Sequence, residues 1–317
     1  MPSTAAQQLH AQGLLRPRAE TARKLLEKCM LCPRQCQVNR LAGDPGLCGI
    51  AARAKVASFG PHFGEEQPLV GRQGSGTIFF AGCNLRCCFC QNYDISQGQD
   101  VDLAEEVDAQ SLAAIMLDLQ RQGCHNINLV TPSHVVPHIL EALPLAIEGG
   151  LVLPLVFNSS GYDNLATLRL LEGVVDIYMP DFKFWRPETA TRYTLAPDYP
   201  DVAKAALTAM YRQVGDLELD PAGLAVSGLL VRHLLMPGGL PETEEILRFL
   251  ATQISKETYV NIMAQYHPCG EIAAFLELNQ PISNHPYQQA VDFACSQGLH
   301  RMDQPDFARL LRRLGWP

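Results

Sequence analysis

The sequence predicts an α/β protein: a partial (β/α)6 parallel barrel preceded by a small N-terminal Cys-rich module. From Thr77 onward, short apolar runs alternate with longer amphipathic segments, which is the pattern of strands each followed by a helix. Such repeats place a parallel sheet inside and the helices outside. The runs number six, too few for a closed eight-fold barrel, so we expect an open one.

The apolar runs and the amphipathic segments between them locate the expected elements. The expected strands are residues 77–81, 127–131, 152–157, 175–180, 227–236 and 259–264. The expected helices lie near residues 103–122, 134–149, 163–172, 187–212, 241–255 and 286–298. In the first helix Leu112, Met116 and Leu119 fall at helical spacing and mark one apolar face.

The sequence predicts that the chain is divided into four parts. We expect an N-terminal helix, with an amphipathic stretch at 20–28, and a four-Cys module within residues 1–55. Residues rich in Gly then suggest a connecting segment at 56–75, followed by the barrel at 76–300 and a C-terminal tail at 301–317. Parallel βα repeats collect functional groups at the carboxyl ends of their strands.

Composition narrows the class of protein. Of the 317 residues, 47% are hydrophobic and 18% are charged, as in a folded globular protein. The formal net charge is -8 and no basic stripe is present, so a nucleic-acid partner is not expected. The sequence shows no signal peptide and no apolar run long enough to cross a bilayer. We therefore expect a cytoplasmic protein without a membrane partner.

The cysteines fall mostly in two groups. There are 11, and in a cytosolic protein clustered thiols stay reduced and indicate metal or redox chemistry. Cys124, Cys269 and Cys295 stand alone and are expected to be small buried hydrophobic residues.

The second group carries the strongest motif. Cys83, Cys87 and Cys90 stand in C-x3-C-x2-C spacing directly after the first expected strand. Three thiolates on one loop can hold three irons of a [4Fe-4S] cluster and leave the fourth iron for another ligand, whereas a structural zinc site requires four protein ligands. The aromatic Phe89 precedes the last of the three, and the adjacent Cys88 is expected to be a spare thiol.

This loop resembles the signature of the radical S-adenosylmethionine (SAM) superfamily. The stretches GSGTIFFAGCNLRCCFCQNYDIS, NINLVTPSH and DIYMPDFKFW are most similar to an uncharacterised branch related to the pyruvate formate-lyase activating enzymes. The likeness covers roughly residues 25–300. It implies an oxidoreductase that reductively cleaves SAM to a 5′-deoxyadenosyl radical for hydrogen abstraction, the chemistry belonging to the cofactor.

The resemblance also implies SAM-binding residues at the strand ends. Asn158 falls where activating enzymes have an Asp-Thr-Asn-Gly stretch, and an amide can bind the SAM ammonium or ribose. Asp181 and Lys183 match the family's Asp-Leu-Lys, which suits the ribose or ammonium and the carboxylate respectively. Arg232 is expected to line the interior rather than its neighbour, and His267 falls where the activating enzymes have a His near adenine.

The chain departs from these relatives at one position. It lacks the Gly-Gly-Glu stretch that many of them use for the SAM ammonium, and Thr131 or Ser133 is expected to substitute. Ahead of the first strand, His62, Glu65 and Glu66 form either a cover for the site or a solvated loop.

The first cysteine group is a separate candidate metal site. Four thiols in a Gly- and Pro-rich segment can close a tetrahedral zinc shell or hold a second iron–sulfur cluster, and the spacing does not separate the two. Its members are Cys29, Cys32, Cys36 and Cys48.

Three functions are expected from the sequence. The first is activation of a glycyl radical enzyme, with a protein or peptide substrate and an electron donor such as flavodoxin or ferredoxin. The second is radical SAM chemistry on a small molecule or another peptide. The third is a non-catalytic iron–sulfur electron carrier, which would not require a SAM-sized cleft.

Overall fold

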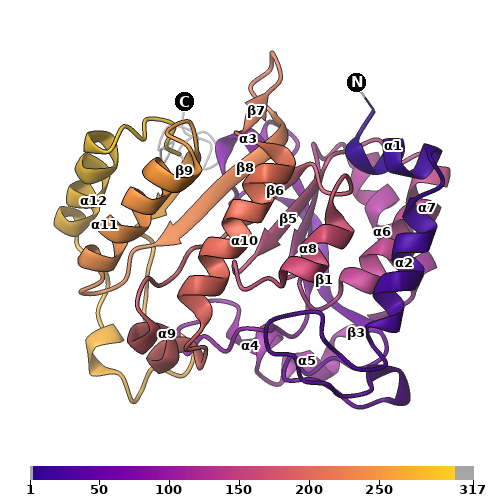
Figure 1. The fold of residues 1–317 in the computed structure, drawn as a ribbon, viewed down its shortest axis with the longest axis horizontal. Helices are drawn as coiled ribbons and strands as arrows, with labels where there is room; N and C mark the ends of the chain where they lie inside the picture. The colour runs from indigo at the N-terminus through magenta and orange to yellow at the C-terminus, as the bar shows by residue number, and fades with distance from the viewer. Residues whose placement is uncertain (1–2, 304–317) are drawn as a thin grey trace.

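The chain folds around one mixed sheet, seen in a computed structural model that describes residues 3–303 (Figure 1). In that part of the chain the sheet has nine strands in the order β3-β1-β2-β4-β5-β6-β8-β7, with β9 also paired to β8. The strands are β1 (Ala54–His62), β2 (Ser75–Phe80), β3 (Glu105–Val107), β4 (Ile127–Val130), β5 (Leu155–Ser159), β6 (Ile177–Pro180), β7 (Glu218–Leu219), β8 (Ala225–Leu234) and β9 (Tyr259–Met263).

Parallel pairing dominates the sheet. Successive strands β2, β4, β5, β6, β8 and β9 pair in parallel, whereas β1, β3 and β7 join antiparallel at the flanks. The sheet does not close on itself. The α/β class is therefore confirmed, and each of the six expected strands is present with ends shifted by a few residues.

Helices cover the outside of this sheet. In Figure 1, α8 and α10 cross in front of the strands, α11 and α12 lie at one side, and α1, α2, α6 and α7 lie at the other. The helices are α1 (Ala5–Ala11), α2 (Leu15–Lys24), α3 (Gln67–Val70), α4 (Tyr93–Ser96), α5 (Asp100–Leu103), α6 (Ala109–Arg121), α7 (Val136–Glu148), α8 (Leu165–Leu171), α9 (Pro187–Thr194), α10 (Tyr199–Val214), α11 (Leu240–Phe249) and α12 (Asn284–Ser296). Shorter turns are η1 (Arg40–Ala42), η2 (Leu250–Ile254) and η3 (Leu276–Leu278).

Three expected elements differ in the structure. The segment 56–75, expected to connect, contains most of β1 and all of α3, and β1 pairs antiparallel with β2. The helix expected from 103 begins only after Asp108, whose carboxylate accepts a hydrogen bond from Ser111 N at 2.8 Å and caps it, while residues 105–107 form β3. The helix expected over 187–212 is broken at Leu195, which is left-handed with φ 54°, and at Pro197, which disfavours helix in the preceding residue.

The N-terminal helix lies earlier than expected. Only residues 20–24 of the amphipathic stretch expected at 20–28 belong to α2, which starts at Leu15 and ends at Lys24, and residues 25–28 form a turn. Residues 1–2, and residues 304–317 of the expected C-terminal tail, lie outside the described residues.

Strand alternation divides the core into two layers. On β5, Leu155 and Phe157 point into the large core beneath the helices, whereas Val156 points inward. Val156 packs there with Ile177 of β6 and with Leu69 of α3, which is fully buried. The short helix α3 thus fills the inner space near the amino ends of the strands and leaves the carboxyl ends free.

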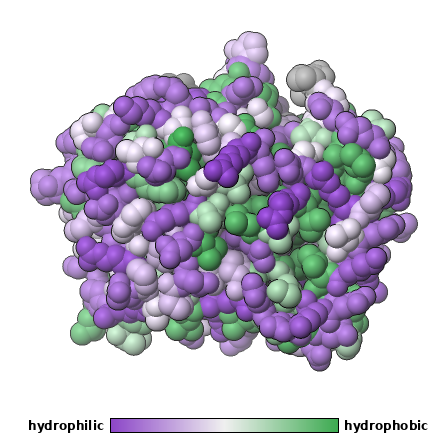
Figure 2. Space-filling model, viewed as in Figure 1, coloured by the Kyte–Doolittle hydropathy of each residue, from purple (hydrophilic) through white to green (hydrophobic). Residues whose placement is uncertain are grey.

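Figure 2 shows the polarity of one face of the molecule. The face in Figure 2 is mostly hydrophilic, with apolar side chains in small groups between polar ones. Among residues 3–303, no helix has both the length and the apolar character needed to cross a bilayer.

Candidate active site

A large cavity opens at the carboxyl ends of the parallel strands. Its volume is about 960 Å³, at the upper end of the range of about 300–1,000 Å³ for small-molecule sites. All six parallel strands or the loops that follow them contribute to its wall. The strand-end residues on the wall are Phe79, Val130, Thr131, Asn158, Asp181, Arg232, Leu234, Asn261 and Met263.

The three signature cysteines line this cavity together. Cys83, Cys87 and Cys90 all lie on its wall. The backbone N–H of Leu85 donates to Cys83 Sγ at 3.3 Å, and the hydroxyl of Ser96 donates to Cys90 Sγ at 3.3 Å. Hydrogen bonds of this kind stabilise thiolate sulfur and tune the potential of a cluster that it binds.

Cys88 is turned away from the cavity. It is absent from the cavity wall, and its backbone is fixed on both sides. Its N–H donates to the carbonyl of Tyr193 at 2.9 Å, and its carbonyl accepts from the N–H of Glu271 at 2.7 Å. Burial raises the pKa of the Cys88 thiol to about 11. The structure therefore separates this thiol from the three that share the cavity.

Burial shapes the chemistry of the cavity thiols. It raises the pKa of Cys83 to about 12 and that of Cys87 well above its usual value. Thiols in such a place become thiolates when a metal supplies positive charge. Among residues 3–303, no three His, Cys, Asp or Glu side chains converge as ligands of one metal ion.

Lys183 and Asp181 form an ion pair beside the thiols. The ammonium of Lys183 binds Asp181 Oδ2, and their side chains are 15% and 20% exposed. Burial alone would lower the pKa of Lys183, but the nearby charges of Asp181 and Cys87 raise it above its usual value. The hydroxyl of Tyr199 accepts from Lys183 N at 2.8 Å and donates to the carbonyl of Ser160 at 2.9 Å. The loop after β6 is thereby tied to the loop after β5.

The ends of β4 and β5 meet over a buried carboxylate. Asp163 accepts hydrogen bonds from Ser133 Oγ at 2.6 Å and Ser159 Oγ at 2.5 Å, and burial raises its pKa. Thr131 has φ 58°, a left-handed conformation that is rare for a β-branched residue and that clusters at functional sites. Thr131 and Asn158 line the cavity, whereas Ser133 is buried against Asp163.

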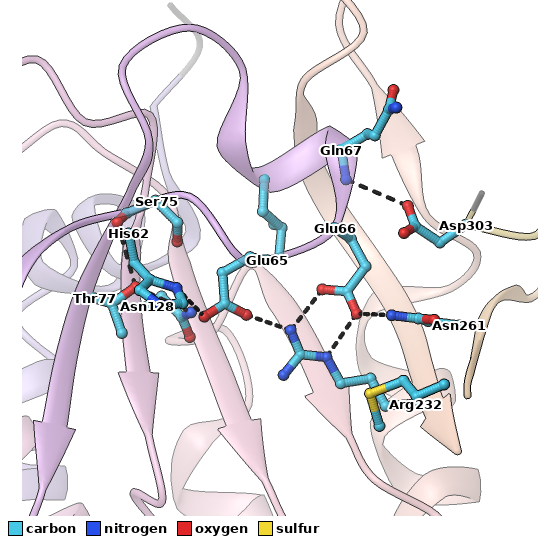
Figure 3. Close-up of polar contacts among 12 residues, drawn as sticks. His62, Glu65, Glu66, Gln67, Ser75, Thr77, Asn128, Arg232, Asn261 and Asp303 are labelled. Carbon is cyan, nitrogen blue, oxygen red and sulfur yellow. Dashed lines mark hydrogen bonds and ion pairs between the residues drawn. The ribbon is translucent and has the colours of Figure 1, made fainter. Parts of the chain in front are cut away.

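Arg232 reaches the cavity but is already paired (Figure 3). Its Nε donates to Glu66 at 2.6 Å, and its Nη2 donates to Glu66 at 2.6 Å and also to Glu65. Burial would raise the pKa of Glu65, but the charge of Arg232 and a hydrogen bond from His62 lower it to about 2. Glu65 and Glu66 are therefore not a solvated loop: they form the wall of the site.

Two further residues complete this network, and the sequence analysis missed both. Asn261 on β9 donates to Glu66 Oε1 at 2.7 Å, and Asp303 accepts from the backbone of Gln67 at 3.3 Å (Figure 3). The only local signal for Asn261 is its place between the apolar residues Val260 and Ile262 on a strand. A polar residue there points to the opposite face, which here is the cavity.

Of two other expected SAM contacts, Phe89 lies on the cavity wall and His267 does not. Phe89 is buried on the cavity wall and packs edge-to-face against Phe184 with ring centroids 5.8 Å apart. His267 is exposed and lies outside the cavity wall, with Nδ1 3.3 Å from the carbonyl of Gln265. The structure thus brings Phe89 to the cysteines and does not bring His267.

The N-terminal four-Cys module lies directly against the signature loop. A Cβ atom on Gly82, the residue before Cys83, would overlap the carbonyl oxygen of Cys48. Arg34, between two module cysteines, donates from Nε to the carbonyl of Asn84 at 2.9 Å. In Figure 1 the module is the indigo loop that runs beside α4 and α5.

Comparison with known proteins gives one informative match. No protein-family model matches the chain. Over 287 residues the chain is 32% identical to a protein of Methanocaldococcus jannaschii, "Uncharacterized protein MJ0674", and the alignment covers 89% of this chain and 78% of that protein. The chain therefore belongs to the same family as the uncharacterized protein MJ0674.

Proposed function

We propose that this chain is a radical SAM enzyme with the fold of a partial (β/α)6 barrel. One observation carries the proposal: Cys83, Cys87 and Cys90 line the same strand-end cavity as Asn158 and the ion pair of Lys183 with Asp181. Among the described residues of that wall there is no fourth cysteine, and three thiolates match a cluster with one open iron. The wall next to them carries cationic, anionic and amide groups, which an amino acid such as the methionine part of SAM requires.

The chain's own residues have distinct tasks in this proposal. Cys83, Cys87 and Cys90 would hold a [4Fe-4S] cluster. When bound, the cluster and SAM supply reductive cleavage to a 5′-deoxyadenosyl radical, which abstracts a hydrogen atom. Lys183 would bind the SAM carboxylate, and Phe89 would shield the cluster from water.

Other cavity residues would orient SAM. The amide of Asn158 forms no hydrogen bond with another side chain in the described part of the chain, so it is available to the ammonium or ribose. Asp181 holds Lys183 and offers its second carboxylate oxygen to the same groups. Arg232 differs, because two glutamates already engage its guanidinium; we assign it to positioning the wall rather than to the SAM carboxylate.

The cavity favours an enzyme over an electron carrier. A carrier needs a cluster near the surface and does not require a cavity of about 960 Å³ beside it. The substrate that loses hydrogen is a protein or peptide if the chain activates a glycyl radical enzyme, and a metabolite otherwise. In either case we propose a cytoplasmic protein that receives electrons from a flavodoxin or ferredoxin.

The decisive experiment measures 5′-deoxyadenosine. The protein is loaded with iron and sulfide without oxygen, its iron is quantified, and SAM and dithionite are added. We expect product that depends on reductant. Absence of product from a protein with a full cluster would remove the radical SAM assignment and leave the electron carrier as the better reading.

A second measurement separates the two substrate classes. An activating enzyme leaves a stable protein-centred radical on its partner, which electron paramagnetic resonance detects in a native anaerobic extract. A metabolite-modifying enzyme instead consumes SAM faster when the right small molecule is added. A radical on a partner protein would exclude the metabolite class as the main substrate.

A further inference from the structure

The four-Cys module contains a buried positive charge that lacks a negative partner. Arg40, the first residue of η1, is 0% exposed. Its Nε donates to the carbonyl of Ala51 at 3.0 Å and its Nη1 to the carbonyl of His134 at 2.7 Å. Both partners are neutral, and Nη2 is buried without any partner in the described part of the chain. A guanidinium remains charged in proteins, and burying it unpaired is costly.

The residues around Arg40 do not supply the missing charge. His134 and His138 are both buried, and burial together with the charge of Arg40 lowers their pKa values to about 3 and about 4. Both imidazoles are therefore neutral at pH 7. Arg40 lies close enough to Cys48 for its charge to act on that thiol. A thiol there becomes an anion when it binds a metal.

The thiols are gathered with backbone support for bound sulfur. A Cβ on Gly46 would lie 3.5 Å from Cys36 Sγ and 3.7 Å from Cys48 Sγ, and the N–H of Leu47 donates to Cys36 Sγ at 3.4 Å. Gln35 and Gln37, which flank Cys36, have φ 42° and 58°. A left-handed conformation is costly for a residue other than glycine, and here one stands on each side of Cys36.

Little apolar packing holds this module. Its own core consists of Leu26, Cys29 and Leu31, separate from the large core of the domain. Small modules with so few buried residues depend on a metal for their fold. Among residues 3–303, no three His, Cys, Asp or Glu side chains are arranged as ligands of a single metal ion.

We propose that Cys29, Cys32, Cys36 and Cys48 bind a second [4Fe-4S] cluster, with Arg40 as its buried counter-charge. Four thiolates around such a cluster give the net negative charge that Arg40 lacks, and a cluster accepts thiols that are spread further apart than zinc ligands. The site lies outside the cavity of the proposed SAM enzyme and does not depend on it.

The position of the module gives this cluster a role, and this step rests on the proposed function. The carbonyl of Cys48 packs directly against Gly82, the residue before Cys83, so the module and the signature loop are in contact. One electron from a low-potential carrier would reduce the module cluster, then pass to the cluster of the cavity and return the module to its oxidised state. The module is thus the entry point for the electron that SAM cleavage consumes.

The test uses the full chain with the cavity cysteines removed. The variant Cys83→Ala/Cys87→Ala/Cys90→Ala is loaded with iron and sulfide without oxygen, and its metals, visible spectrum and dithionite-reduced paramagnetic signal are recorded. We expect about four irons per chain and a signal that SAM does not change, against about eight irons in the unaltered protein. One zinc per chain, or no metal at all, in a folded triple variant would overturn the proposal.

Two further variants test the counter-charge and the relay. Arg40→Gln should lower the reduction potential of the module cluster, because the reduced form loses a neighbouring positive charge; an unchanged potential would contradict its role. Cys29→Ala/Cys48→Ala should lower 5′-deoxyadenosine formation with reduced flavodoxin by a much larger factor than formation with dithionite. Undiminished activity with flavodoxin would overturn the relay. If the radical SAM proposal is wrong and the second cluster exists, neither the unaltered protein nor any variant forms 5′-deoxyadenosine. The triple variant would still bind about four irons per chain.

Discussion

Replacing Arg232 with methionine should destabilise the protein by about 3 kcal/mol or more at pH 7. The substitution keeps most of the side-chain volume and leaves Glu65 and Glu66 buried, with side chains only 6% and 1% exposed. The pKa of Glu65 is about 2 against an ordinary 4.5, and since each pKa unit corresponds to about 1.4 kcal/mol, this carboxylate alone contributes about 3 kcal/mol. Breaking a buried ion pair typically costs about 3–5 kcal/mol.

The sign of the pH dependence follows from the same carboxylate. Because folding lowers the pKa of Glu65, its contribution is fully present above pH 4.5 and is lost as the pH falls from there toward 2. The unaltered protein should therefore lose stability over this window. Arg232→Met lacks the contribution already at pH 7, so its difference from the unaltered protein should shrink as the pH falls.

Urea unfolding followed by far-UV circular dichroism at pH 7 and pH 3.5 measures both effects. Arg121→Met is the matched control, because Arg121 pairs with Asp118 at 2.9 Å with side chains 69% and 41% exposed. Such a surface pair is worth about 0–1 kcal/mol. The reasoning is refuted if Arg232→Met stays within about 1 kcal/mol of the unaltered protein at pH 7, or if its loss is the same at both pH values.

Three further substitutions test other parts of the structure. Cys87→Ala should abolish 5′-deoxyadenosine formation while Cys88→Ala retains most of it; activity in the Cys87 variant would contradict the ligand assignment. Lys183→Met should weaken SAM binding to the iron-loaded protein by about tenfold to a hundredfold, measured by calorimetry, and unchanged affinity would exclude the proposed carboxylate contact. Leu69→Ala, in the fully buried inner layer, should cost about 2–5 kcal/mol in urea unfolding, whereas Leu103→Ala, at an 80% exposed position, should cost almost nothing.

Local patterns were enough to predict the parallel strands. Each is a short run of apolar residues, and packing on both faces of a parallel sheet imposes that composition directly. The strand β1 was missed for the opposite reason. It includes Gly60 and Pro61, which weaken a strand signal, and it pairs antiparallel with β2 over residues that mix polar and apolar types. Its stability comes from a partner that no local pattern reveals.

The site shows the same division between local and distant information. The spacing of Cys83, Cys87 and Cys90 within eight residues was enough to predict that their thiols lie together. The structure places all three on one wall of the cavity. Arg232 lies on the cavity wall, but its partners were not foreseen. Glu66 lies 166 residues earlier in the chain, and a buried ion pair of this separation exists only once the fold brings both ends together.

The segment between β1 and β2 explains why an open sheet can still enclose a cavity. Because the sheet does not close, the region between β1 and β9 needs another element to complete the wall. Leu69 of this segment packs among inward apolar residues of the strands, while Glu66, three residues earlier, binds Arg232 of β8 and Asn261 of β9. This short segment therefore supplies an apolar residue, Leu69, to the inner core and a charged residue, Glu66, to the cavity wall. Changes in its length or charge should alter the shape and charge of the cavity before they alter the parallel sheet, so this segment is where relatives with different substrates are expected to differ.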